Sequence, residues 1–225
     1  PADCRRVFPN FEQPDLKAVF NFRITAPRDW VVSSNGVLES EVSDPTDSNI
    51  VKRVFAPTKR ISTYITAVLA GEYFTVTDTY KPQSITNSGD IPLVAYCRHS
   101  LKPHFDYDNI FRVTKNGLDF FQDLFDYPYP YPKYEQAFVP EYNIGAMENP
   151  GLVTFTEDFI FVSGATEDDL EGRANTICHE MAHMWFGDLV TMKWWDDLWL
   201  KESFADFMGA LGAIEANGFN DAWVT

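Results

Sequence analysis

The period of the hydrophobic pattern changes near residue 97, and this change most restricts the folds that the chain can adopt. Before it, apolar and polar residues alternate, as in LKAVFNFRI at residues 16–24, which is typical of half-buried strands. After it, apolar residues recur at helical spacing over residues 106–125. We therefore expect an α+β protein, with an antiparallel β domain over residues 1–97 followed by a domain of helices and strands over residues 98–225.

Turn signals divide the β domain further. Asn35-Gly36 stands between two apolar runs, and an Asn-Gly pair in that setting predicts a β-hairpin turn. The polar stretch SITNSGD at residues 84–90 predicts a break before the strand IPLVAYC.

Cap and breaker signals bound the helices of the second domain. The prolines of YPYPYP end the first helix, because they donate no backbone hydrogen bond. Thr166 with Asp169 three residues later is typical of a capped helix start. We expect two strands, at YEQAFVP and LVTF, and Trp194, Trp195 and Trp199 as core residues between the last two helices. The expected helices span residues 106–125, Thr166 to about Phe186, and about 198–217.

Charge and composition exclude several function classes. The chain has 18 Lys and Arg residues against 33 Asp and Glu, a formal net charge of −15, so a nucleic-acid backbone would be repelled. No apolar run reaches the roughly eighteen residues of a membrane helix. The three cysteines form no CxxC pair, which favours a reducing compartment. We expect a cytoplasmic protein with no membrane segment and no nucleic-acid partner.

The motif HEMAH within the second predicted helix is the strongest chemical signal. His179 and His183 lie four residues apart, so on a helix both imidazoles face one point. Glu180 lies about 100° round from His179 on an ideal helix, where its carboxylate could reach a water without binding the metal. HExxH is typical of a metalloprotease, with two metal ligands and a general base. The alternative, two packed core histidines, is disfavoured by the full motif.

A catalytic zinc ion usually takes three protein ligands and leaves one position open. The carboxylates that follow the motif are Asp188, Asp196, Asp197 and Glu202. Glu202 is preferred, since it alone lies within the next helical pattern, where packing could hold it rigidly. His179, His183 and Glu202 form a set of two nitrogens and one oxygen that suits one zinc ion.

Two blocks carry a resemblance to a known family: HEMAH followed by 18 residues and Glu202, and GAMEN at residues 145–149. Together with DCRRVFPNFEQPDLKAVF near the start, they resemble the zinc aminopeptidases of the aminopeptidase N type, a gluzincin family. The resemblance implies a thermolysin-like α/β catalytic domain after the β domain. Both domains are expected to be incomplete, so that the chain is a fragment. Lys201 and Ser203 stand where the family commonly has Asn and Gly.

The resemblance also implies a substrate-binding role for GAMEN, whose residues are Gly145, Ala146, Met147, Glu148 and Asn149. Its strand would run along the bound peptide, and Glu148 would hold the free α-ammonium of the substrate. The small residues Gly145 and Ala146 independently permit a peptide backbone to approach as an added strand.

These observations predict a zinc-dependent aminopeptidase that hydrolyses the N-terminal bond of peptides with a metal-activated water and Glu180 as general base. Two alternatives stay open: a fragment that binds zinc and peptide with little turnover, and an endopeptidase with the same zinc site. The first alternative arises because the family's transition-state tyrosine follows the zinc glutamate, and residues 203–225 contain no tyrosine.

Overall fold

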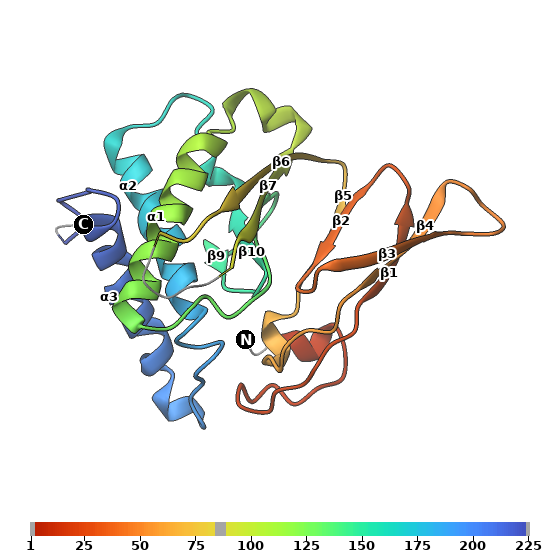
Figure 1. Cartoon of the computed structure of the whole chain (residues 1–225), viewed down its shortest axis with the longest axis horizontal. Helices are drawn as coiled ribbons and strands as arrows, with labels where there is room; N and C mark the ends of the chain where they lie inside the picture. Colours follow the sequence, from red (N-terminus) through yellow and green to blue (C-terminus); the bar gives the residue numbers. More distant parts are fainter. Residues whose placement is uncertain (1–2, 84–88, 224–225) are drawn as a thin grey trace.

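The computed structural model describes residues 3–83 and 89–223. Most of the polar break expected at residues 84–90 therefore lies outside the described residues. The helices gather on one side of the molecule and the strands of the N-terminal part on the other (Figure 1).

The N-terminal part consists of short antiparallel strands. β1, β4 and β3 form a sheet in that order, and β2 pairs with β5 in a second sheet. The antiparallel β character expected for this part is confirmed. Its elements are η1 (Cys4–Arg6), β1 (Arg23–Pro27), β2 (Val31–Ser34), β3 (Leu38–Ser43), β4 (Ile50–Phe55), η2 (Thr63–Ile65) and β5 (Val68–Gly71).

The hairpin expected at Asn35-Gly36 is wrong. β2 and β3 flank this dipeptide, but β2 pairs with β5 and β3 with β4. The buried side chain of Asn35 explains the difference: its Nδ2 donates to the carbonyls of Ile65 and Pro150, at 2.9 Å each. Its Oδ1 accepts from the N–H of Ala67 at 2.8 Å. Asn35 thus joins distant segments instead of closing a turn between its neighbours.

A five-stranded mixed sheet, in the order β6-β7-β8-β10-β9, forms the centre of the molecule. β7, β8 and β10 are parallel to one another, and both outer pairs are antiparallel. The sheets divide before residue 73, earlier than the boundary expected at residue 97, because β6 and β7 hydrogen-bond into the sheet of the following segment. The strands are β6 (Tyr73–Tyr80), β7 (Ile91–Arg98), β8 (Tyr134–Val139), β9 (Ala146–Met147) and β10 (Leu152–Thr156).

Among the described helices, α1 and α2 contact this sheet, whereas α3 packs on α2 and α1 (Figure 1). Short 3₁₀ turns connect several of these elements. Fully buried apolar side chains fill the layer between helices and sheet, including Leu93, Phe138, Phe121 and Ile177. A second cluster, with Leu69 of β5 and Leu152 of β10, joins the N-terminal part to the sheet. The α+β class is therefore confirmed. The remaining elements are η3 (His99–His104), α1 (Tyr107–Phe125), η4 (Glu157–Phe159), α2 (Glu167–His183), η5 (Trp195–Asp197) and α3 (Trp199–Glu215).

The helix signals are largely confirmed. Asp126 ends α1 in the left-handed conformation, just before the proline-rich connector. Thr166 and Asp169 form the expected capping box, in which each side chain accepts from the other's backbone N–H. α2 ends at His183 instead of near Phe186, because the chain turns there and the Phe186 carbonyl accepts a hydrogen bond from the His183 ring.

The expected tryptophan core between the last two helices is wrong for two of its members. Trp194 is 53% exposed and Trp199 is 60% exposed. Both lie at the turn around η5, outside the contact between α2 and α3. Among the described helices, none combines the length and the apolar character that a membrane crossing requires.

Candidate active site

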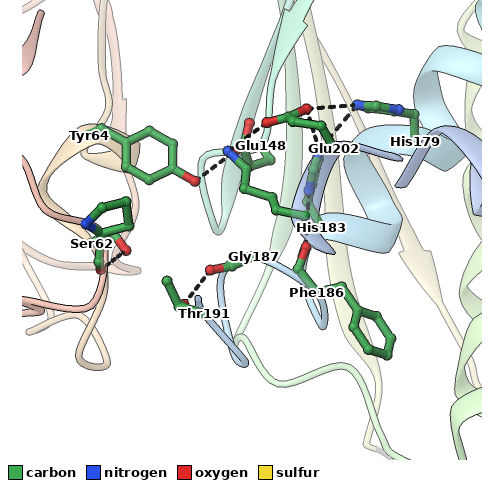
Figure 2. A network of polar contacts seen from close by, with 11 residues as sticks. Ser62, Tyr64, Glu148, His179, His183, Phe186, Gly187, Thr191 and Glu202 are labelled. Atoms are coloured by element: carbon green, nitrogen blue, oxygen red, sulfur yellow. Dashed lines mark hydrogen bonds and ion pairs between the residues drawn. The ribbon is translucent and has the colours of Figure 1, made fainter. Parts of the chain in front are cut away.

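The side chains of His179, His183 and Glu202 converge at one point (Figure 2). His183 ends α2 and His179 lies one turn earlier, while Glu202 lies in the first turn of α3. The two Nε2 atoms are 3.1 Å apart. The Oε2 of Glu202 lies 3.6 Å from the Nε2 of His183 and 3.9 Å from that of His179. The structure therefore brings together the three residues predicted as metal ligands.

Each imidazole is oriented by an acceptor at its other nitrogen. The Nδ1 of His183 donates to the Phe186 carbonyl at 3.0 Å, and that of His179 donates to the carboxylate of Asp206 at 3.0 Å. These partners place the ring hydrogen on Nδ1 and leave both Nε2 lone pairs facing the same point. Burial and then the neighbouring His183 lower the pKa of His179, which favours the neutral ring that a metal requires.

The donor set fits a zinc ion. Two lone pairs that face each other across 3.1 Å repel unless a cation lies between them. Donors about 2.0–2.1 Å from a tetrahedral zinc ion are roughly 3.3 Å from one another, close to the separations of these three atoms. Two nitrogens and a carboxylate oxygen are also a ligand set of catalytic zinc.

A close contact between α2 and α3 brings Glu202 to the histidines. A Cβ added at Gly209 of α3 would lie 2.6 Å from the Oδ1 of Asn175 and 3.1 Å from the Cβ of His179. Glycine at this position therefore lets α3 approach the turn of α2 that carries the first histidine.

The other candidate ligands do not join the donor set. Asp196 and Asp197 lie in η5, and neither belongs to a metal-binding group within the described part of the chain. Asp188 is 1% exposed, and its carboxylate has no hydrogen-bond partner among the described residues. Burial, and then the charge of Glu148, raise the pKa of Asp188 well above its usual range, which favours the neutral acid.

Glu180 lies beside the donor set without belonging to it. Its carboxylate comes within 4.8 Å of donor atoms of Glu148 and His183. The side chain is buried, and within the described residues its Oε2 has no hydrogen-bond partner. Burial, followed by the charges of Glu148 and Glu202, raises the pKa of Glu180 well above its usual range. A buried carboxylate with a raised pKa is suited to accept and return a proton during catalysis.

The GAMEN segment lies at an outer edge of the five-stranded sheet. Ala146 and Met147 form β9, which pairs with β10, and its other side has no partner strand among the described residues. The backbone carbonyl of Gly145 accepts from Thr156 at 2.9 Å. The buried side chain of Asn149 donates to the hydroxyl of Thr154 at 3.1 Å and so holds the turn that follows β9. The segment is thus positioned as a short edge strand that ends at Met147, directly before Glu148.

Glu148 lies at the end of this strand, in contact with two donors. The hydroxyl of Tyr64 donates to its Oε1 at 2.7 Å, and the ammonium of Lys201 contacts the same oxygen. Burial opposes ionisation, but the charge of Lys201, then that of His183, and both hydrogen bonds outweigh it and lower the pKa of Glu148 to about 2. Glu148 is therefore a buried carboxylate that is held ionised.

Comparison with known proteins identifies the family. Residues 110–224 match the peptidase family M1 domain, and residues 1–65 match the peptidase M1 N-terminal domain. The chain belongs to peptidase family M1.

Three relatives of this M1 chain show how much of it is shared. Aminopeptidase N of Streptomyces lividans is 50% identical over 225 residues, which cover 99% of this chain and 25% of that protein. Aminopeptidase N of Homo sapiens is 37% identical over 94% of this chain and 22% of that protein. Glutamyl aminopeptidase of Rattus norvegicus is 34% identical over 96% of this chain and 22% of that protein. The chain spans about a quarter of the length of the curated relatives it matches.

The structure adds three residues to the M1 site that the sequence reasoning did not assign to it: Asp206, Tyr64 and Lys201. Asp206 follows Glu202 by four residues on α3, so helical spacing could have indicated that both face the histidines. Tyr64 gave no local signal, because it reaches Glu148 from the 3₁₀ turn η2 of the N-terminal part. Lys201 stands where the family commonly has Asn, and this difference alone indicated no function for it.

Proposed function

We propose that this chain carries the metal site and part of the substrate site of a zinc aminopeptidase, which hydrolyses the N-terminal bond of peptides. The convergence of His179, His183 and Glu202 beside the buried Glu180 is the observation that carries the proposal. The printed names of the relatives, aminopeptidase N and glutamyl aminopeptidase, support the same reaction class. We also propose that the helices and the mixed sheet belong to a thermolysin-like catalytic domain.

His179, His183 and Glu202 would hold the zinc ion, with the orientation of both rings fixed by their Nδ1 partners. When bound, zinc supplies Lewis acidity toward the scissile carbonyl and the attacking water.

Glu180 would act as the general base. Its buried carboxylate, with a raised pKa, would take a proton from the attacking water and return it to the leaving amine. The Oε2 of Glu180, to which the described residues supply no hydrogen-bond partner, is the atom available for this transfer. Burial around Glu180 excludes competing water, which strengthens each electrostatic interaction in the site.

Glu148 and β9 would bind the start of the peptide. Within residues 3–83 and 89–223, no strand pairs with the outer edge of β9, to which an extended substrate could add as a further strand. Glu148, at the end of that edge, would pair with the α-ammonium and thereby restrict cleavage to the first bond. A cavity of about 510 Å³ borders this edge, and we propose that it receives the first side chain of the substrate. Its lining includes Val7, Phe8, Tyr64, Tyr142 and Met147.

A substitution at Glu180 tests the proposal. Glu180→Gln should lower kcat for a leucine arylamide by about 10²–10⁴-fold, since the general base is lost, while the zinc content stays at one ion per chain. Full activity in this variant would refute the assignment of the base. A parent protein that binds zinc without any turnover would support the alternative of a binding fragment.

Blocked substrates separate the aminopeptidase from an endopeptidase. The arylamide with a free amine should be cleaved, and its N-acetyl derivative should not, because acetylation removes the charge that Glu148 would bind. Equal cleavage of both would indicate an endopeptidase with the same zinc site.

Three further points stay predictions. The first is the cytoplasmic location. The second is that the chain is a fragment. The third is the domain division, which we propose to place between β5 and β6, because the sheets divide there.

A further inference from the structure

Lys201 places a buried ammonium between the two functional carboxylates of the site. The residue is 3% exposed, and its Nζ lies 3.0 Å from the Oε1 of Glu202. The same Nζ contacts the Oε1 of Glu148 and lies 4.4 Å from the centre of the Tyr64 ring. A buried ammonium requires such partners, because an unpaired charge in the interior is costly.

Lys201 contacts one oxygen, Oε1, of each of the two carboxylates. In Glu202, Oε1 binds Lys201, and Oε2 faces the two imidazoles. In Glu148, the donors found among the described residues are Tyr64 and Lys201, and both bind Oε1. One ammonium therefore fixes one oxygen of each carboxylate and leaves the second oxygen of each for another partner.

The surrounding chain makes room for the lysine stem. Gly187 has a φ of +132°, and a Cβ added there would lie 3.1 Å from the Cγ of Lys201 and 3.2 Å from the Nδ1 of His183. A side chain at position 187 would thus press on both the lysine and a metal-binding histidine. The turn that follows α2 therefore leaves space for the Lys201 side chain at this position.

We propose that Lys201 is a positioning residue that couples the metal ligand Glu202 to the amine-binding Glu148. This inference rests on the proposed function. Lys201 orients Glu202 so that Oε2 meets the metal, and it orients Glu148 so that Oε2 meets the α-ammonium of the substrate. Metal binding and recognition of the peptide N-terminus then share one internal cation.

The sign of the effect on zinc affinity separates this role from a simple charge effect. A positive charge close to a divalent cation opposes its binding, so removal of Lys201 would strengthen zinc binding if only its charge mattered. Loss of a residue that orients a metal ligand typically weakens metal binding by about 10–100-fold. Lys201→Met should therefore weaken zinc binding by about 10-fold or more, measured by competition with a chelator at fixed pH.

Lys17 supplies a matched control. Its half-buried ammonium donates to the main-chain carbonyls of Asp188 and Leu189, at 2.6 and 3.3 Å, and no carboxylate contact to it appears among the described residues. Lys17→Met removes the same charge near the site, and its zinc affinity should stay within about threefold of the parent, as for a charge outside the ligand contacts. Unchanged or stronger zinc binding in Lys201→Met, or an equal loss in both variants, would overturn the proposal.

A double variant keeps the test valid if Lys201→Met does not fold. Lys201→Met leaves Glu148 buried without its counter-ion, which is strongly destabilising, whereas Lys201→Met with Glu148→Gln removes that unpaired charge. The double variant should still bind zinc at least about 10-fold more weakly than Glu148→Gln alone, because Glu202 has lost its partner. Equal zinc affinity of these two proteins would overturn the proposal.

Binding of L-leucinamide and N-acetyl-L-leucinamide to the zinc-loaded protein tests the second half of the inference. The parent should prefer the free amine, and in Lys201→Met this preference should fall about 10-fold, as expected for a loss of about 1.4 kcal/mol. A stronger preference would show that Lys201 competes with the substrate amine, and would overturn the proposal. A parent that binds no zinc or shows no preference would instead refute the proposed function.

Discussion

The proposed metal-binding side of the site and its proposed amine-binding side are assembled in different ways. His179, His183 and Glu202 lie on two adjacent helices, and the contact of α2 with α3 is sufficient to bring them together. Tyr64 and Glu148 come from η2 and from the end of β9, which lie in the two parts of the molecule. The metal side thus depends on helix geometry, whereas the amine side depends on how the N-terminal part packs on the sheet.

The same difference predicts which side tolerates a change at the junction of the two parts. Asn35 bonds to Ile65, next to Tyr64, and to Pro150, two residues after Glu148. Ser33, Lys133 and Glu135 add a buried polar network between β2 and the segment of β8. A substitution at this junction should therefore weaken binding of the substrate amine more than binding of zinc.

Asn35→Ala should have a larger effect than substitutions at Asp206 or Tyr64. It leaves two carbonyls and one N–H without their partner, so the free energy of unfolding should fall by about 2–3 kcal/mol. Denaturant unfolding measures this loss, and the exposed Asn49 provides a control, Asn49→Ala, expected within about 0.5 kcal/mol of the parent.

Ligand binding to the same variant tests whether the two sides of the site are assembled independently. In Asn35→Ala the preference for L-leucinamide over its acetylated form should fall about 10-fold, a loss of about 1.4 kcal/mol, while zinc affinity stays within about threefold. If zinc binding fell as far as amine binding, the two sides would not be independently assembled.

On the metal side, Asp206→Ala should weaken zinc binding by about 10-fold, because the Nδ1 of His179 loses the acceptor that fixes its ring. The preference for the free amine should not change. Asp206→Asn keeps an acceptor oxygen for the Nδ1 of His179. Its zinc affinity should therefore fall only about threefold, because the ring is still partly oriented. Chelator competition measures all three proteins, and equal affinity in Asp206→Ala and the parent would remove Asp206 from the site.

Local signals predicted the metal side because each of them acts within one or two helices. The spacing of His179 and His183, the cap at Thr166 and the helical position of Glu202 depend on helix geometry alone. The sequence therefore indicated both the helices and the convergence of the three donors. It also indicated that Asp188 was a weaker candidate than Glu202, which agrees with its absence from the donor set.

The parts that local signals did not predict are those decided by tertiary contacts. Asn35-Gly36 has the residue types of a hairpin turn, yet the buried bonds of Asn35 to distant backbone groups direct β2 and β3 to different sheets. Lys201 follows Leu200 and precedes Glu202 in a pattern that a solvated lysine would also fit. Only its tertiary position, between Glu148 and Glu202, shows that the ammonium is buried.

Tyr64→Phe should have a smaller effect than Asn35→Ala or Asp206→Ala, and it isolates the amine side. The substitution removes one hydrogen bond to Glu148 at 2.7 Å but keeps the ring beside the Lys201 ammonium. A hydrogen bond to a charged group contributes about 1.5–3 kcal/mol. Because Lys201 still holds the same oxygen, only part of this contribution should be lost: we expect an L-leucinamide affinity about fivefold weaker, a loss of about 1 kcal/mol, with unchanged zinc affinity. Tyr127, which is 47% exposed, offers Tyr127→Phe as a control with no change in either affinity. A loss of zinc affinity in Tyr64→Phe would mean that the contact from η2 also supports the metal ligands, so that the two sides would form one cooperative unit.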